Sequence, residues 1–311
     1  MKIVKNILFV VLCIVVFVLF YAIGSKGAMT KFANDKFKDL KTSWNGLVLK
    51  DLTYGDNPQN TYDLYLPEKT KENYSLILHI HGGGFYAGDK KEGEILCRYF
   101  ASQGCVCASV NYPLMDSANA SNINIMYDEI VRSIDEIIKV SDEKGYHITE
   151  MATTGESAGG CLAMLVAFRY GKDAPVPIRF VMQESGPASF IPELWADVDN
   201  QKKIEFVNNM TGENFALEDC DSEEYNKAIA KISPASYVNE NTIPILLAYG
   251  AGDLVVVPKV KEPLLEALEE SNVKHDYILF PNSGHSLYND PDKMQEYRAK
   301  MKEYVEIYFQ N

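Results

Sequence analysis

Beyond residue 45 the chain alternates between short apolar runs typical of strands and longer stretches with helical spacing of apolar residues. Strand-like runs occupy residues 46–52, 61–66, 75–81, 106–112, 148–155, 178–184, 243–250 and 275–280, and helical spacing occupies 124–140, 158–170, 259–271 and 291–309. Strands that alternate with helices pair in parallel, and the helices cover both faces of the resulting sheet. No helix separates the first two runs, so we expect them to form an antiparallel edge. The sequence therefore predicts an α/β fold with a mostly parallel central sheet.

This alternation lapses between about residues 186 and 242, where mixed segments such as FIPELW and NNMTGENF replace it. A connection of that length inside a compact domain usually covers a site or shapes a pocket. Residues 27–311 contain no internal repeat and no low-complexity linker. The sequence therefore predicts one α/β domain over 27–311, with helices on both faces of its sheet and a small cap-like insertion at about 186–242.

Residues 1–26 differ in composition from this domain. Lys2 and Lys5 precede an uninterrupted apolar run over 7–23, which is longer than the core of most signal peptides and slightly short of an ideal membrane span. No small-residue cleavage site follows, so an uncleaved membrane anchor is favoured over a cleaved signal segment. Five lysines between residues 26 and 41 favour a cytoplasmic domain, whereas the short, signal-like start favours the opposite orientation. We expect a membrane-anchored or secreted protein whose domain is extracytoplasmic.

Charge and cysteine spacing argue against two kinds of binding site. The formal net charge is −13 and lysine and arginine are not clustered, whereas nucleic-acid binding needs basic patches that neutralise phosphates. The six cysteines lack zinc-ligand spacing. Cys105 and Cys107 alternate along one strand, so we expect both to point to the same face as buried apolar side chains. The sequence predicts no nucleic-acid partner and no metal site, and it identifies no protein partner.

Three consecutive glycines at 82–84, within HIHGGGF, follow directly on the strand-like run that begins at residue 75. Glycine costs conformational entropy, so three in a row are expected only where the backbone turns sharply or another group approaches it closely. The run indicates either a tight strand-to-helix turn or a set of exposed backbone amides. His79 and His81 share one side of the strand, but no other residue has the spacing of a companion metal ligand. A structural role is therefore expected for His79.

The motif GESAG at 155–159 lies where a strand-like run passes into a helical stretch. In a G-x-S-x-G turn the glycines permit a cramped backbone that lifts the serine oxygen out of the sheet. Ser157 occupies that position, so it is the candidate nucleophile. Serine is a poor nucleophile at neutral pH, and it needs a base and a group that orients the base.

Two strand-terminal loops supply these groups. Asp253 follows the run at 243–250, and His285 follows the run at 275–280. Ligands and catalytic groups in open α/β sheets gather at the carboxyl ends of the strands. The chain order Ser157, Asp253, His285 therefore predicts a nucleophile, an acid and a base that meet at one edge of the sheet.

Together these segments resemble the α/β-hydrolase fold, in its carboxylesterase and hormone-sensitive-lipase-like branch, over about residues 45–309. The resemblance is carried by HGGGF at 81–85, GESAGG at 155–160, the Asp253 loop and the GHS around His285. Two features depart from the branch. Glu156 stands where aspartate is common, and NYPLMD at 111–116 replaces a YRLAPE-like stretch. The second departure bears on the sub-branch and on the shape of the acyl pocket.

The resemblance implies a serine carboxylic-ester hydrolase that acts on small-molecule esters of short acyl chains and needs no cofactor. The amides of Gly83, Gly84 and Ala158 would form an oxyanion hole, which accepts the negative oxygen that appears when the serine attacks a carbonyl. His81 would hold the shape of the glycine loop.

His285 would take the serine proton and return it to the leaving alcohol, while Asp253 would fix the tautomer of His285. A serine peptidase or an acyltransferase on the same fold would use the same groups with a different pocket. A non-catalytic binding protein of this fold is a third class, which the N-terminal anchor motivates and which intact Ser157 and His285 argue against. Candidate pocket-lining aromatic residues are Phe85, Tyr86 and Trp195.

Overall fold

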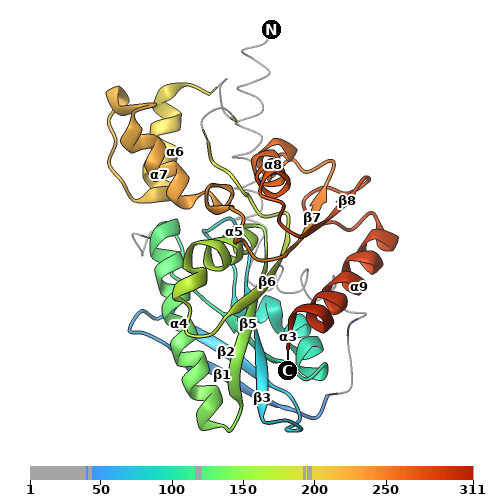
Figure 1. Cartoon of the computed structure of the whole chain (residues 1–311). Helices are drawn as coiled ribbons and strands as arrows, with labels where there is room; N and C mark the ends of the chain where they lie inside the picture. Colours follow the sequence, from blue (N-terminus) through green and yellow to red (C-terminus); the bar gives the residue numbers. More distant parts are fainter. Residues whose placement is uncertain (1–39, 41–43, 116–120, 192–193, 195–197, 311) are drawn as a thin grey trace.

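The computed structural model describes residues 40, 44–115, 121–191, 194 and 198–310, and these residues form a mixed sheet of eight strands (Figure 1). The strands are β1 (Leu47–Thr53), β2 (Thr61–Leu66), β3 (Asn73–Ile80), β4 (Val106–Val110), β5 (His147–Glu156), β6 (Ile178–Glu184), β7 (Ile245–Gly250) and β8 (His275–Phe280). Their order is β1-β2-β4-β3-β5-β6-β7-β8. β2 pairs antiparallel with β1 and with β4, and all other neighbouring strands are parallel. The predicted mostly parallel sheet with an antiparallel edge is confirmed.

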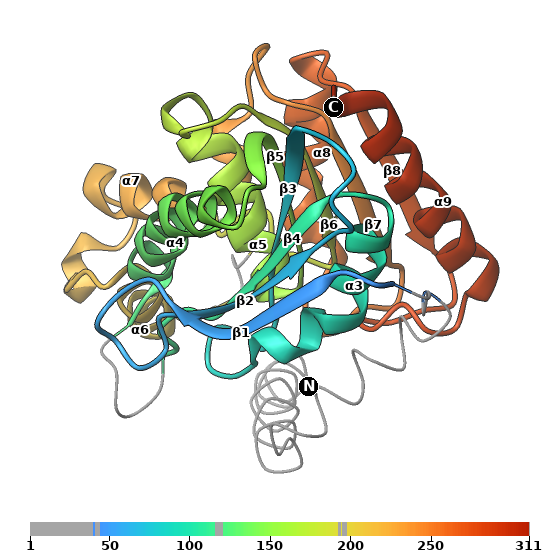
Figure 2. The ribbon, with the colours of Figure 1, turned by 90° about the horizontal axis from the view of Figure 1, so that it is seen from below.

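Helices cover both faces of this sheet (Figure 2). They are α3 (Glu94–Ser102), α4 (Ile123–Glu143), α5 (Ala158–Leu165), α6 (Asn200–Thr211), α7 (Glu223–Ile232), α8 (Glu262–Glu270) and α9 (Pro291–Tyr308). Residues of α4, α5 and α8 pack in the core on one face, and residues of α3 and α9 pack in the core on the other. The four predicted helical stretches are confirmed as α4, α5, α8 and α9. The sequence did not predict α3, α6 or α7.

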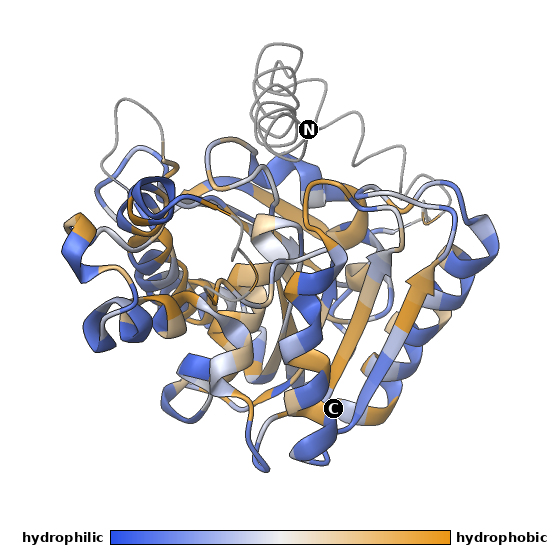
Figure 3. Ribbon diagram, turned by 90° about the horizontal axis from the view of Figure 1, so that it is seen from above, coloured by the Kyte–Doolittle hydropathy of each residue, from blue (hydrophilic) through white to orange (hydrophobic). Residues whose placement is uncertain are grey.

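The two cores exist because side chains alternate between the faces of each strand. Leu76 and Leu78 of β3 belong to the core beneath α4 and α5, and Ile77 between them belongs to the core beneath α3 and α9. The central parallel strands are buried along almost their whole length, which explains their nearly continuous apolar sequences. Figure 3 shows hydrophobic residues concentrated on the strands and hydrophilic residues on the outward faces of the helices.

The cysteines at 105 and 107 behave as the alternation predicts. Cys105 and Cys107 are both free and both lie in the core beneath α3 and α9. Burial raises the pKa of the Cys105 thiol to about 12, so it stays protonated at neutral pH. These residues are therefore apolar core side chains, which confirms the prediction.

The long connection between β6 and β7 carries α6 and α7, which pack against each other. α6 contacts the start of α4, where Asn124 Nδ2 donates to the Thr211 carbonyl at 3.0 Å. Both helices lie at the end of the molecule where α4 begins and the parallel strands end (Figure 1). The predicted anchor or signal segment at 1–26 lies outside the described residues and stays a prediction. Within the described part of the chain, no helix combines the length and apolar character that crossing a membrane requires.

Candidate active site

Ser157 occupies a strained turn between β5 and α5. Its φ of 54° and ψ of −124° are unfavourable for a residue that carries a side chain. The Ser157 amide donates to the Glu184 carbonyl at 2.7 Å, which ties the turn to β6. Gly155 and Gly159 permit the turn, because a Cβ at either position would overlap the carbonyl oxygen of Ile80. The GESAG motif thus presents the Ser157 side chain at the carboxyl end of β5.

The side chains of Ser157, His285 and Asp253 form one continuous series of contacts. His285 Nε2 lies 2.9 Å from Ser157 Oγ, and His285 Nδ1 lies 2.8 Å from Asp253 Oδ2. Asp253 is buried, and its other oxygen accepts the amides of Val255 and Val256 at 2.8 and 2.9 Å. A carboxylate held in this way keeps the Nδ1 hydrogen of the imidazole toward itself and leaves Nε2 to accept the serine hydroxyl.

Neighbouring strands bring these groups together from distant parts of the chain. Asp253 follows β7 and His285 follows β8, and the Gly252 amide donates to the Ser283 carbonyl at 3.0 Å between the two loops. Ser185, buried at the end of β6 with a φ of 51°, donates its hydroxyl to the His285 carbonyl at 3.1 Å. Sequence reasoning missed Ser185, although its position at the carboxyl end of a central strand was an available signal.

The glycine loop after β3 adopts a backbone that suits glycine at two positions. Gly83 and Gly84 have φ values of 108° and 62°. The Gly83 carbonyl accepts the amides of Tyr86 and Ala87 at 3.1 and 3.0 Å, which closes the turn. These two hydrogen bonds mean that the loop's own backbone contributes to its shape.

This loop passes directly beside the candidate nucleophile. A Cβ on Gly82 would lie 3.4 Å from the Cβ of Ser157 and 2.9 Å from the carbonyl oxygen of Glu156. Ala158 begins α5, and amides in the first turn of a helix have no partner within the helix. The glycine loop and the start of α5 thus both lie next to Ser157, and backbone amides in such places can stabilise a negative oxygen.

His81 supports the glycine loop from within the core. Its Nδ1 donates to the Gly82 carbonyl at 2.7 Å, and its ring stacks on Tyr112 with centroids 4.4 Å apart. The Tyr112 hydroxyl donates to the His81 carbonyl at 2.7 Å. Burial lowers the pKa of His81 to about 4, so the ring is neutral at neutral pH. A neutral ring with a hydrogen on Nδ1 fits the shape-holding role expected for His81.

A polar cluster lies behind the glycine loop, where β3 and β5 end. His79 Nε2 lies 3.4 Å from one carboxylate oxygen of Glu156, and the Gly82 amide donates to the other at 3.4 Å. His79 Nδ1 lies 3.1 Å from the Ser109 hydroxyl oxygen. Both ring nitrogens of His79 contact protein groups, which agrees with the predicted structural role.

Glu92 is buried near this cluster, in the helical turn Lys90–Gly93. Its Oε1 accepts the Asp89 amide at 3.2 Å as part of a capping box. Burial, with a smaller effect from the Glu156 carboxylate, raises the pKa of Glu92 from 4.5 to about 8. Between these two pH values the unfolded chain releases a proton that the folded chain keeps, so the free energy of unfolding falls as the pH rises.

Replacing Glu92 with glutamine is expected to remove this pH dependence. Glutamine has no ionisable group, and its amide oxygen can still accept the Asp89 amide. At pH 8 the variant should exceed the wild type in free energy of unfolding by about 4 kcal/mol, and at pH 4.5 the two should agree. Urea unfolding followed by tryptophan fluorescence measures both values. Glu270→Gln, at an exposed position, is the control. An equal fall with pH in the wild type and in Glu92→Gln would contradict the expectation.

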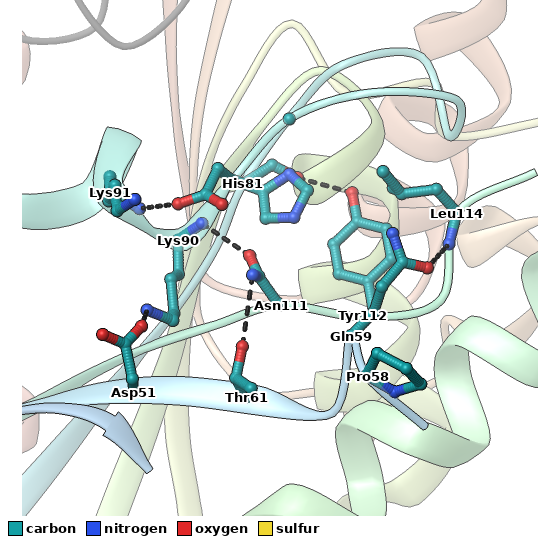
Figure 4. A pocket seen from close by; sticks show the side chains of 12 residues that line it. Asp51, Pro58, Gln59, Thr61, His81, Lys90, Lys91, Asn111, Tyr112 and Leu114 are labelled. Atoms are coloured by element: carbon teal, nitrogen blue, oxygen red, sulfur yellow. Dashed lines mark hydrogen bonds and ion pairs between the residues drawn. The ribbon is translucent and has the colours of Figure 1, made fainter. Parts of the chain in front are cut away.

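A polar cavity of about 260 Å³ lies beside the glycine loop, with His81 in its wall (Figure 4). One charged group in its wall is paired with two carboxylates: Lys90 Nζ lies 2.6 Å from Asp51 and 2.6 Å from buried Asp63. Asn111 Oδ1 accepts the Lys90 amide at 2.6 Å. Ser157, Asp253 and His285 do not line this cavity, so it is a separate feature from the serine site. Across the described ranges, histidine, cysteine, aspartate and glutamate form no group of three that could hold a metal ion.

The predicted pocket-lining aromatic residues fall in different places. Phe85 is buried in the core beneath α4 and α5, and its carbonyl accepts the Met115 amide at 2.9 Å. Tyr86 is half-buried against the same core. Trp195 lies outside the described residues. Phe85 therefore anchors the glycine loop to the segment after β4.

Comparison with known proteins identifies the family. Residues 62–268 match the family BD-FAE. A kynurenine formamidase from Salmo salar is 24% identical over 241 residues, which cover 76% of this chain and 74% of that protein. Three other curated relatives are matched over 27–38% of their own length.

Solved structures share the fold. Esterase B from Lactobacillus rhamnosis has a TM-score of 0.68 at 17% identity, and the match covers 97% of this chain and 96% of that chain. The butyrate-bound structure of Est2 from Thermogutta terrifontis has a TM-score of 0.66 at 18% identity, with coverage of 82% and 92%. These likenesses show that the predicted α/β-hydrolase fold is correct. Since the family match also spans more than half of the 311 residues, the chain belongs to the BD-FAE family of α/β-hydrolase esterases.

Proposed function

We propose that the protein is a serine carboxylesterase that cleaves short acyl esters through a covalent acyl-enzyme. One observation carries the proposal: Ser157 Oγ, the imidazole of His285 and the buried carboxylate of Asp253 are linked by contacts of 2.9 and 2.8 Å. Such a series supplies a nucleophile, a base and an orienting group within hydrogen-bond reach of one another.

In the first half of the reaction, His285 Nε2 removes the Ser157 proton as Oγ attacks the carbonyl carbon of the ester. The carbonyl π bond breaks, and its electron pair moves to the oxygen, which becomes negative. The imidazolium then donates its Nε2 proton to the alcohol oxygen as the carbonyl reforms and the carbon–oxygen bond breaks. The alcohol leaves, and the acyl group stays on Ser157. Asp253 stabilises the imidazolium throughout.

The negative oxygen requires donors that are in place before the reaction. We assign this role to the backbone amides of Gly83, Gly84 and Ala158, on the grounds that the glycine loop and the start of α5 lie beside Ser157. This assignment puts the chain in the branch of esterases that use an HGGG oxyanion loop. His81 acts as a positioning residue, because it holds the Gly82 carbonyl and does not reach the reacting atoms.

In the second half of the reaction, His285 removes a proton from water, which attacks the acyl carbon. Collapse of the second tetrahedral intermediate returns the proton to Ser157 Oγ and releases the carboxylic acid. Every proton that moves is carried by His285, so the cycle needs no cofactor.

A short acyl chain is supported by the related Est2 structure, which holds butyrate. The test is a series of p-nitrophenyl esters from acetyl to decanoyl, assayed with the full chain in detergent. We expect the highest kcat/KM at acetyl to butyryl and a fall of at least about tenfold by decanoyl, because an acyl chain that outgrows its pocket loses favourable contacts. Highest activity on decanoate would refute the short-acyl proposal. No activity on any ester would refute the esterase and direct the search to peptide bonds or acyl acceptors.

A further inference from the structure

Exposed apolar side chains flank the loops that carry Asp253 and His285. Among the described residues, the large apolar side chains with the greatest exposure include Leu254 at 66%, Val255 at 45% and Tyr288 at 40%. Leaving such side chains in water forfeits the free energy that burial would supply. Leu254 and Val255 directly follow Asp253, and Tyr288 follows His285 by three residues, so their exposure calls for an explanation. We call Leu254, Val255 and Tyr288 the apolar rim.

The part of the rim formed by Leu254 and Val255 is held in place by defined contacts. The amides of Val255 and Val256 donate to Asp253 Oδ1, and the next side chain along, Val256, is buried. The Gly252 amide donates to the Ser283 carbonyl, which ties this loop to the His285 loop. The exposure of Leu254 and Val255 is thus part of a hydrogen-bonded turn. A fixed apolar surface can bind an apolar group with little loss of conformational freedom.

The chemistry of the proposed reaction directs one part of the ester to this side. His285 Nε2 must come within hydrogen-bond distance of the alcohol oxygen in order to protonate it. The carbonyl oxygen faces the glycine loop and the start of α5, and the alcohol oxygen faces His285. The substituent on that oxygen therefore leaves the site past the loops on the His285 side, which carry the rim.

From this placement we infer that the apolar rim receives the alcohol part of the substrate, and that the natural substrates are short acyl esters of apolar alcohols. The inference rests on the proposed esterase function and names its substrate class. Contact with three apolar side chains removes part of an alkyl chain from water, whereas a polyhydroxylated alcohol would lose hydrogen bonds to water there and gain none from these side chains.

The test keeps the acyl group constant and varies the alcohol. Dissolved methyl, propyl, hexyl and 2,3-dihydroxypropyl butyrate are hydrolysed in a pH-stat, which measures released butyric acid. We expect kcat/KM to rise about twofold for each added methylene, the value for a half-buried methylene. Propyl butyrate should exceed its dihydroxypropyl counterpart by at least about fivefold.

Two variants locate the effect. In Leu254→Ser/Val255→Ser the ratio of kcat/KM for hexyl over methyl butyrate should fall at least about threefold below the wild-type ratio. Ile307→Ser, which removes a side chain of similar exposure (60%) from α9, should keep the wild-type ratio. If the double variant has a lowered unfolding midpoint, Leu254→Ser alone supplies the measurement.

The outcomes separate the two claims. If the wild type cleaves none of the esters, the esterase itself fails. Equal kcat/KM for all alcohols, or a wild-type ratio in the double variant, overturns the rim assignment and leaves the esterase intact. The double variant could instead keep the wild-type ratio of hexyl over methyl butyrate on dissolved esters and lose activity only on esters presented in phosphatidylcholine vesicles. That result would overturn the assignment in favour of membrane docking.

Discussion

Replacing Ser157 with alanine is expected to lower kcat/KM for p-nitrophenyl butyrate by about 10⁵-fold, near the limit of detection. Alanine keeps the backbone and removes only Oγ, the atom that lies 2.9 Å from His285 Nε2. Without it no acyl-enzyme can form. The proposed oxyanion donors and the binding surface remain, so a small acceleration over water is expected to survive. Initial rates of nitrophenol release give the residual activity. The variant is first treated with a serine-directed phosphonate, which inactivates any contaminating wild-type enzyme.

Two further variants show whether the contacting side chains act as a unit. His285→Ala should cost about as much as Ser157→Ala, and the double variant should cost little more than either single change. Ser236→Ala, at an exposed serine of the segment between β6 and β7, should keep wild-type activity. A Ser157→Ala residual within tenfold of the wild type would rule out Ser157 as nucleophile.

Gly83→Ala is expected to lower kcat about 10²- to 10³-fold, the typical cost of losing an oxyanion donor. Alanine at a φ of 108° is strained, and its Cβ would overlap the carbonyl oxygen of Ala87. The loop must shift to relieve this overlap, which moves its amides away from Ser157. The value of KM should change much less than kcat, because the donors act mainly on the transition state.

Gly104→Ala is the matched control for that change. Gly104 also has a positive φ, of 88°, but a Cβ there meets only the side chain of Lys71 at 3.6 Å. It should lower the free energy of unfolding by about 1 kcal/mol and leave kcat unchanged. Steady-state kinetics and thermal unfolding of both variants decide the matter. A Gly83→Ala enzyme with kcat within threefold of the wild type would show that the loop supplies no donor.

The sequence predicted the sheet well because its central strands are buried on both faces. Such strands read as continuous apolar runs, as in SLILHI before the glycine loop and IPILLAYG before Asp253. The glycine-flanked serine and the two strand-terminal loops were also readable, because their positions at strand ends follow from the same pattern. The prediction that Ser157, Asp253 and His285 meet follows from parallel strands, which bring their carboxyl ends to one edge.

Other elements depended on tertiary contacts that no short pattern reveals. α6 packs mainly on α7 and on α4, and its apolar spacing is weak. α7 was readable, because its buried residues Tyr225, Ile229 and Ile232 follow helical spacing. The caps of α6 were also readable: the Asp199 side chain accepts the first amides of the helix, and Gly212 ends it with a left-handed φ of 79°. The burial of Glu92 was not readable, because it arises where a turn packs against β3 and β4.

The contact between Gly159 and the end of β3 has a consequence for how such chains diversify. It brings the serine turn against the strand that leads into the glycine loop through backbone atoms, since a Cβ at Gly159 would overlap the carbonyl oxygen of Ile80. Substitutions of exposed side chains around the site therefore leave this backbone contact intact. Descendants of one ancestral gene can exchange exposed residues around the site, and so acquire new substrates, without rebuilding the bond-breaking chemistry.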